Sequence, residues 1–147
     1  MALDGGSGRD VGDYENSPTP VTIDLQNGFA IGGLGYDILV SVEAAHGSAH
    51  GDTIIMRNPD AGTTVGWYVN SRAGNDAITG GTGDDYVTPG SGKDTIMGGP
   101  GYDTVNYKDD GDNFYGDKSK TTTGVVVNLA EGWAIDNWGD RDTLSSI

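Results

Sequence analysis

The chain has 147 residues, which is room for one domain, and its 26 glycines and 35% hydrophobic content predict a thin apolar core. Its formal net charge of −14 disfavours nucleic acid and anionic membranes as partners, because both carry the same sign of charge. The chain contains no cysteine, which excludes disulfides and thiolate zinc sites and leaves oxygen atoms as the expected metal ligands.

The two ends of the sequence give no sign of a membrane segment. No stretch is long and apolar enough to span a membrane, and no basic and apolar leader follows Met1. The sequence starts inside a glycine-rich, repeat-like stretch and stops abruptly at Ile147. We therefore expect a piece of a longer protein that is monomeric as a fragment.

Residues 1–61 are expected to form an N-terminal flank. Apolar residues alternate from Val21 to Leu25 and predict a strand, and the Gly28-Phe29 pair predicts a turn that reaches back over the repeats that follow. Two glycine-rich stretches, GGLGYDILV and GSAHGDTII, then lead through an aspartate into apolar residues. The flank therefore contains one or two turns that resemble repeat units.

His46 and His50 have the spacing of two zinc ligands on one helical face. Glycines surround them, however, and no third soft ligand lies nearby. We therefore expect both to be exposed loop histidines.

Residues 62–115 contain a strict nine-residue repeat. Each unit has a glycine, an aspartate two residues later, and an apolar residue two residues after that. The apolar positions are Val69, Ile78, Val87, Ile96 and Val105, the aspartates are Asp76, Asp85, Asp94 and Asp103, and the glycines are Gly74, Gly83, Gly92 and Gly101. Counting onward reaches Asp112 and Phe114 in a frayed unit, and counting back reaches Trp67 where an aspartate belongs.

The repeat predicts a turn followed by a short strand in every unit. Glycines permit the positive φ of a tight turn, and the residues after each aspartate suit a strand. Units this short have no core of their own and must stack on one another. We therefore predict an all-β fold, a right-handed, β-helix-like parallel β-roll in which two nine-residue units complete one turn.

Residues two units apart then become neighbours in adjacent turns. This register pairs Asp76 with Asp94, Asp85 with Asp103, and Asp94 with Asp112. Two carboxylates about one strand spacing apart repel each other unless something bridges them, and a hard cation with about six to eight oxygen ligands suits such a pair. Carbonyl oxygens of the turns would supply the remaining ligands.

Residues 116–147 follow the same pattern as the N-terminal flank. An insert with three consecutive threonines, expected to be an exposed loop, leads to alternating apolar positions from Val125 to Leu129. The Gly132-Trp133 pair and another turn that ends in an aspartate follow. We interpret both flanks as capping strands or as ends of adjoining rolls, because open strand edges need cover.

The units GGTGDDYVT and GGPGYDTVN resemble the nonapeptide of the repeats-in-toxin (RTX), hemolysin-type calcium-binding family. The resemblance implies a parallel β-roll with several Ca²⁺ ions between successive turns, held by carboxylates and backbone carbonyls. The implied ligands are Asp76, Asp85, Asp94, Asp103 and Asp112, with the turn residues Arg72, Gly74, Gly81, Gly83, Gly90, Ser91, Gly92, Gly98, Gly99, Pro100 and Gly101. A further site is expected at Asp37 with Gly33 and Gly35, whereas Asp52, Asp142 and Asp10 match the pattern less well.

The family also implies a function. We expect a module that folds on binding calcium outside a bacterial cell, as the structural part of a protein exported by type I secretion. The aspartates are periodic and lie in turns, and no nucleophile elbow occurs, so we expect no catalytic activity.

The alternative is a carbohydrate-binding or adhesion module, as in an alginate epimerase or a large adhesin, with a sugar or a cell-surface ligand as partner. The aromatic residues Trp67, Tyr68, Trp133 and Trp138 would then stack on sugars. Otherwise they would plug the ends of the roll.

Overall fold

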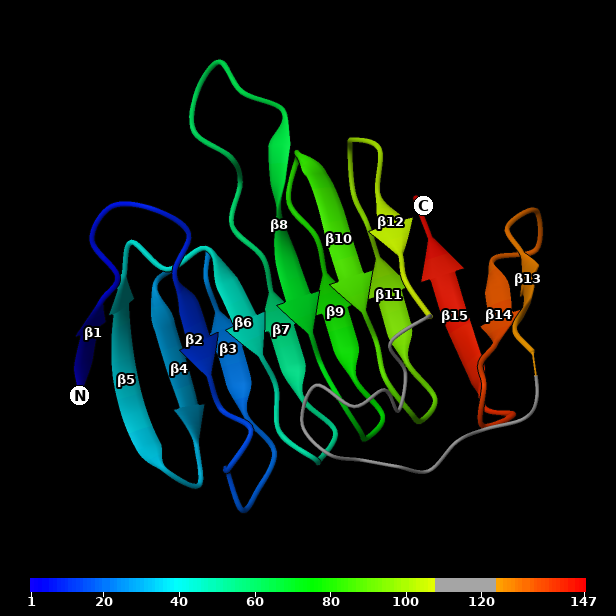
Figure 1. Ribbon diagram of the computed structural model, residues 1–147, viewed down its shortest axis with the longest axis horizontal. Helices are drawn as coiled ribbons and strands as arrows, with labels where there is room; N and C mark the ends of the chain where they lie inside the picture. Colours follow the sequence, from blue (N-terminus) through cyan, green and yellow to red (C-terminus); the bar gives the residue numbers. More distant parts are fainter. Residues whose placement is uncertain (108–123) are drawn as a thin grey trace.

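The computed structural model describes residues 1–107 and 124–147, which form two β-sheets that lie face to face (Figure 1). The ten-stranded sheet has the order β1 (Ala2–Asp4), β5 (Gly35–Val40), β4 (Phe29–Gly32), β3 (Thr22–Asp24), β7 (Thr53–Ile55), β9 (Ala77–Thr79), β11 (Thr95–Met97), β15 (Arg141–Ser145), β14 (Trp133–Ile135) and β13 (Val126–Asn128). The five-stranded sheet has the order β12 (Thr104–Val105), β10 (Asp84–Thr88), β8 (Val65–Asn70), β6 (Ala44–His46) and β2 (Val11–Asp13). These two ranges of residues contain no helix that could cross a membrane.

The core lies between the sheets, and the central strands β7, β8, β9, β10 and β11 each contribute one fully buried apolar residue to it. Ile54, Ile78 and Ile96 are paired across β7, β9 and β11, and Val69 and Val87 are paired across β8 and β10. All five are at most 2% exposed. The chain alternates between the two sheets, so residues two units apart become parallel neighbours. The predicted all-β parallel roll, with two strands in each turn, is confirmed.

Strands β3, β4 and β5 form an antiparallel unit that we call the N-terminal meander. β4 pairs with β3 on one side and with β5 on the other. The outer strands of the meander pair in parallel with roll strands, β3 with β7 and β5 with β1. Because both of its edges find partners, this flank is built into the ten-stranded sheet between β1 and β7. Of the two expected arrangements, it resembles the junction of adjoining rolls more than a terminal cap.

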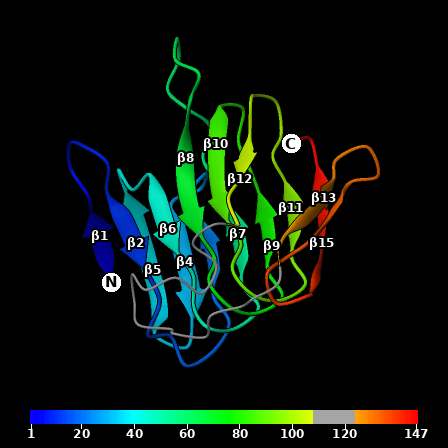
Figure 2. The ribbon, with the colours of Figure 1, turned by 45° about the vertical axis from the view of Figure 1, so that its right-hand side comes forward.

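Strands β13, β14 and β15 repeat this arrangement at the C-terminal end of the sheet, and we call them the C-terminal meander (Figure 2). β15 pairs in parallel with β11, as β5 pairs with β1. Gly28 and Gly132 have φ values of 74° and 70°, and their carbonyl oxygens accept hydrogen bonds from Leu39 and Leu144, both at 2.8 Å. The predicted likeness of the two flanks is therefore confirmed.

The turns in the N-terminal meander differ from the sequence prediction. Phe29 pairs with Asp24 inside the sheet, so the turn at Gly28 closes a hairpin and does not reach back over the roll. Gly33 and Gly35 lie at the next turn, between β4 and β5, where the strands are antiparallel. The stretch GGLGYDILV thus forms a hairpin, because the edge of β4 offers it an antiparallel partner.

Candidate metal centre

Four aspartates lie in a row where strands of the ten-stranded sheet begin, and we call them the first ladder: Asp52, Asp76, Asp94 and Asp142. The backbone N–H of each donates to Oδ1 of the next, at 2.7 Å for the first step and 2.8 Å for the other two. All four residues are at most 2% exposed. The row follows from the strand register, because Asp52, Asp76 and Asp94 directly precede β7, β9 and β11, and Asp142, the second residue of β15, is in register with them.

The first ladder confirms one predicted pair and corrects another. Asp76 and Asp94 are neighbours, as expected. Asp112 lies outside the described residues, and the strand that pairs with β11 is β15, so the neighbour of Asp94 is Asp142. Counting in nines missed this step, because the chain reaches β15 only through the C-terminal meander, 48 residues after Asp94.

Acidic residues also lie where strands of the five-stranded sheet begin, and we call this row the second ladder. Asp85 donates its N–H to Oδ1 of Asp103 at 2.9 Å, which confirms the predicted pair. Trp67 donates to Oδ1 of Asp85 at 2.8 Å, and Asp10 donates to Oε2 of Glu43 at 3.1 Å. The strand register places these five residues in one row, which lacks a carboxylate only at Trp67.

A guanidinium lies where the second ladder lacks its carboxylate. Nη1 of Arg57 is 3.2 Å from Oε1 of Glu43, and Cζ of Arg57 is 5.4 Å from the ring centroid of Trp67. Arg57 belongs to the insertion between β7 and β8, which the sequence shows only as a break in register. Glu43 is 7% exposed, so a side-chain cation balances a buried charge at this level.

Replacing Arg57 with methionine is expected to destabilise the folded protein by about 3 kcal/mol, because it leaves the Glu43 carboxylate buried without its cation. The matched control is Arg72→Met, which removes a pair with Glu15 whose side chains are 24% and 26% exposed and should cost less than about 1 kcal/mol. Urea unfolding in calcium measures both. Adding Glu43→Gln should restore most of the loss, and a variant as stable as the control would contradict this role.

The glycines before the aspartates let the backbone pass close to the carboxylates. A Cβ at Gly80 would lie 2.8 Å from Oδ2 of Asp85, and a Cβ at Gly98 would come still closer to Oδ2 of Asp103. Within the described residues, Oδ2 of Asp76 and Oδ2 of Asp103 are buried and accept no hydrogen bond. The ladders therefore hold buried carboxylate oxygens that have no hydrogen-bond partner and that suit a cation as ligands.

The predicted turn residues lie in two stacks. Gly74 donates its N–H to the Ser91 carbonyl, and Ser91 donates to the Arg72 carbonyl, both at 2.9 Å. One stack holds Arg72 and Gly74 below Gly90, Ser91 and Gly92, and the other holds Gly81 and Gly83 below Gly98, Gly99, Pro100 and Gly101. The sequence therefore placed these residues in the turns that flank the ladders.

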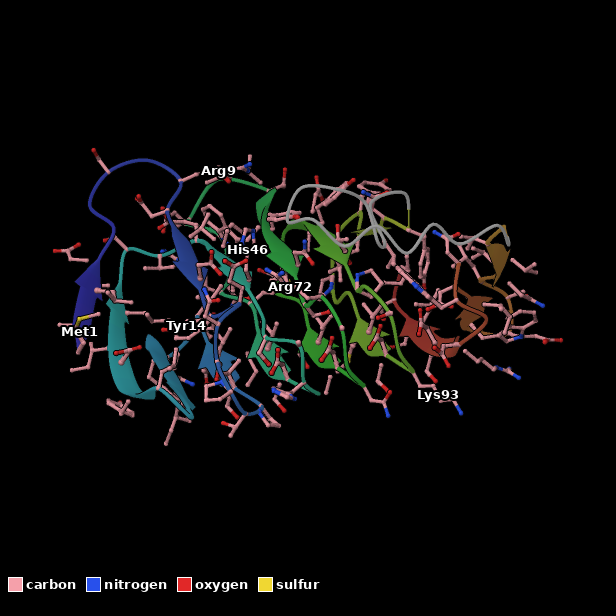
Figure 3. The ribbon with its side chains drawn as sticks, turned by 60° about the horizontal axis from the view of Figure 1, so that its bottom comes forward. Met1, Arg9, Tyr14, His46, Arg72 and Lys93 are labelled. Atoms are coloured by element: carbon pink, nitrogen blue, oxygen red, sulfur yellow. The ribbon has the colours of Figure 1, made fainter. Side chains whose placement is uncertain are left out.

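Asp37 belongs to β5, next to β1 at the other end of the ten-stranded sheet, and it contacts Met1 and Tyr14, which Figure 3 labels. Its Oδ2 accepts a hydrogen bond from the Tyr14 hydroxyl at 3.3 Å, and its Oδ1 lies 2.9 Å from the Met1 ammonium group. Asp142 holds the same place in the C-terminal meander, with the Tyr107 hydroxyl at 2.8 Å. Asp37 thus lies beside the amino group of Met1, whereas Asp142 lies beside another aspartate, Asp94.

The buried carboxylates have raised pKa values. Burial, together with the charges of Asp52 and Asp142, raises the pKa of Asp76 to about 7. Burial also raises the pKa of Asp142 to about 6, and it is the main cause of the raised pKa values of Asp85, Asp103 and Asp136. Each of these groups therefore favours a proton or a nearby cation.

Carbonyl oxygens are needed to complete any ion site in the ladders. In residues 1–107 and 124–147, no three acidic or histidine side chains converge on one point. A cation would therefore bind two carboxylates of a ladder step together with backbone carbonyls of the stacked turns. Calcium prefers this all-oxygen set.

The segment at the centre of both ladders matches a known family. Residues 71–105 match the family model of the RTX calcium-binding nonapeptide repeat, in four copies. These residues are RTX repeats. The match includes Asp76, Asp85, Asp94 and Asp103, and it confirms the resemblance seen in the nonapeptides. No curated protein matches the chain.

The RTX repeats are calcium-binding repeats, and the ladders fit that ion in charge and in ligand type. The sequence found the four aspartates inside the match, but it ranked Asp52 and Asp142 below them and missed Glu43. Asp52 has a clear signal once the insertion is allowed for, since it lies 24 residues before Asp76 in a similar turn. Glu43 has none, because no glycine turn precedes it.

Calcium binding to RTX repeats that are already folded is expected to release protons near pH 6 to 7. In the metal-free roll the pKa of Asp76 is about 7, above its unfolded value, so its protonation stabilises the roll at low pH. That stabilisation is complete below about pH 4 and is lost as the pH rises through about 7. Calcium needs the ionised carboxylates, so its affinity should instead rise with pH.

Isothermal titration calorimetry in buffers of different ionisation enthalpy measures this proton release. We expect at least half a proton per molecule at pH 6.5 and less at pH 8.5. The same heat in every buffer at pH 6.5 would mean that the carboxylates are already ionised before calcium binds, as they are in a chain that is unfolded without calcium.

Proposed function

We propose that this chain is a structural module of an exported protein and that it folds when calcium binds outside the cell. The carrying observation is Asp76, which is 2% exposed, has an Oδ2 atom that accepts no hydrogen bond, and is flanked by Asp52 and Asp94. A row of such charges opposes folding unless cations lie between them. Binding and folding are then one equilibrium.

The low calcium concentration inside a cell would leave this chain unfolded, which suits passage through a type I secretion system. The higher calcium concentration outside would complete the ladders and fold the roll. The module itself is non-catalytic in this proposal, and any activity of a longer protein would lie elsewhere. The RTX match supports the calcium step, because RTX repeats are calcium-binding repeats.

Circular dichroism in excess chelator and in millimolar calcium tests the proposal. We expect the β-sheet signal and protection from proteolysis only in calcium, with magnesium as the control cation, because magnesium demands a stricter octahedral site. The same β content in chelator as in calcium would rule out calcium-dependent folding.

A second candidate function is carbohydrate binding, favoured by a groove on the five-stranded sheet. The groove has a volume of about 450 Å³, and its lining includes Arg9, Trp67, Asp84 and the neighbouring rings of Tyr68 and Tyr86, whose centroids are 5.9 Å apart. Aromatic rings beside polar groups suit sugars. Trp67 lies on the central strand of this sheet, away from the ends of the roll.

Guanidinium groups already lie over two of the three tryptophans, Trp67 and Trp133. Arg9 and Arg57 lie 6.0 and 5.4 Å from the Trp67 ring, and Arg141 lies 4.9 Å from the Trp133 ring. Tyr86, which is 40% exposed, is therefore the better stacking residue. A glycan panel on calcium-loaded protein tests this, with Tyr86→Ala expected to lose binding and Tyr36→Ala, on β5, expected to retain it.

A further inference from the structure

The outer edge of β13 ends the ten-stranded sheet and has no partner strand among the described residues (Figure 1). Val127 and Leu129 are 49% and 56% exposed at this edge. The matching residues of the N-terminal meander, Ile23 and Leu25, are 0% and 5% exposed. The two meanders therefore share a topology but differ in whether their apolar edge is covered.

Strand β7 provides the cover over the N-terminal meander. It pairs in parallel with the outer edge of β3 and places Ile54 opposite Ile23. Thr53 donates its N–H to the Val21 carbonyl, and Leu25 donates to the Ile55 carbonyl, both at 2.9 Å. A meander of this kind therefore accepts a short parallel strand with an apolar residue at its centre.

Strand β1 has the properties of such a strand. Leu3 pairs with Leu39 of β5, as Ile96 of β11 pairs with Leu144 of β15. β7 is aligned with β11 through β9, so Leu3 corresponds to Ile54. β1 is the other end of the ten-stranded sheet, and its outer edge is likewise unpaired within residues 1–107 and 124–147.

We propose that β13 of one molecule binds β1 of a second copy of this chain. The strands pair in parallel with Val126, Val127 and Asn128 opposite Ala2, Leu3 and Asp4, which is the register of β3 with β7. This pairing covers the apolar edge and continues the sheet across two molecules. Each molecule uses two different edges, so the association is head to tail and stays open to further copies. In a monomer, as expected from the sequence, both edges would lack a partner strand from the described part of the chain.

Charge sets the conditions for this association. Each copy carries a formal net charge of −14, which opposes contact at low ionic strength. The contact itself adds little to this repulsion. At the β3–β7 junction Asp52 lies beside Val21, whereas in the proposed contact Met1 takes the position of that aspartate. Association should therefore strengthen as salt shortens the screening length.

Cysteine cross-linking tests the register, because the natural chain contains no cysteine. Ala2→Cys and Val126→Cys proteins, mixed in calcium with a mild oxidant, are expected to form a mixed dimer. Paired residues on neighbouring strands lie about 5 Å apart, within the reach of a disulfide. The rate should exceed at least tenfold that of a control mixture of Val11→Cys and Val126→Cys, in which both positions are also exposed.

Sedimentation velocity in calcium provides the second readout. The average mass of the natural chain should rise with protein concentration, and Val127→Asp should weaken association at least tenfold. The control is Ile31→Asp, at a position that is 49% exposed on β4 and pairs with the uncharged Thr22 and Tyr36, which should associate normally. A single monomeric species at every concentration, or equal cross-linking in both cysteine mixtures, would overturn the proposal. Cross-linking of Val126→Cys with itself at the faster rate would overturn it as well.

Discussion

Replacing Asp94 with asparagine is expected to weaken calcium binding at least tenfold, which is about 1.4 kcal/mol, while stabilising the calcium-free roll. Asp94 lies between Asp76 and Asp142, so its carboxylate serves two steps of the first ladder. Asparagine keeps the Oδ1 atom that accepts the Asp76 N–H, and it replaces the charged Oδ2 with a neutral NH2 group, which cannot bind a cation. The same change that deprives calcium of a ligand therefore also removes a buried charge that opposes folding.

Asp103→Asn is the matched control for this prediction. Asp103 accepts one ladder hydrogen bond, from Asp85, and among the described residues it ends the second ladder. Its loss should affect one step and should shift the calcium midpoint less. Calcium titrations followed by circular dichroism compare the two variants, and the residual β-sheet signal in chelator measures the metal-free roll. Equal shifts would mean that Asp94 does not serve two steps.

The parts of the site that the sequence predicted are those set by local repetition. The spacing of Asp76 and Asp94 follows from two nine-residue units, each of which forms one turn and one strand. Ile78 and Ile96 are buried opposite each other for the same reason. A uniform period converts directly into a uniform register, because every unit adds the same length of chain.

The parts that the sequence missed depend on segments that return after an insertion. Asp142 joins the first ladder only because the C-terminal meander brings β15 back beside β11. Arg57 reaches Glu43 from the insertion between β7 and β8, and no spacing rule connects these two residues. Pairing between distant segments is decided by which strand edges remain open, and a single sequence does not show this.

Replacing Gly92 with alanine is expected to destabilise the calcium-loaded protein far more than the same change at Gly8. The two glycines have nearly the same φ, 126° and 127°, so alanine meets the same backbone strain at both positions. A Cβ at Gly8 would have nothing within 4 Å, whereas a Cβ at Gly92 would overlap the Gly74 carbonyl in the turn below. The difference between the variants therefore isolates the close stacking of the turns from the cost of the backbone conformation.

Gly8→Ala should cost about 1–2 kcal/mol, the usual range for such strain. Gly92→Ala should cost about 4 kcal/mol or more, because the turn must move away from Gly74 and thereby separates Asp94 from Asp76. That separation should also raise the calcium concentration needed for folding, an effect that Gly8→Ala should lack. Urea unfolding at several calcium concentrations measures both quantities. Equal losses at the two positions would show that backbone conformation alone demands these glycines, and that close stacking of the turns does not hold the carboxylates in place for calcium.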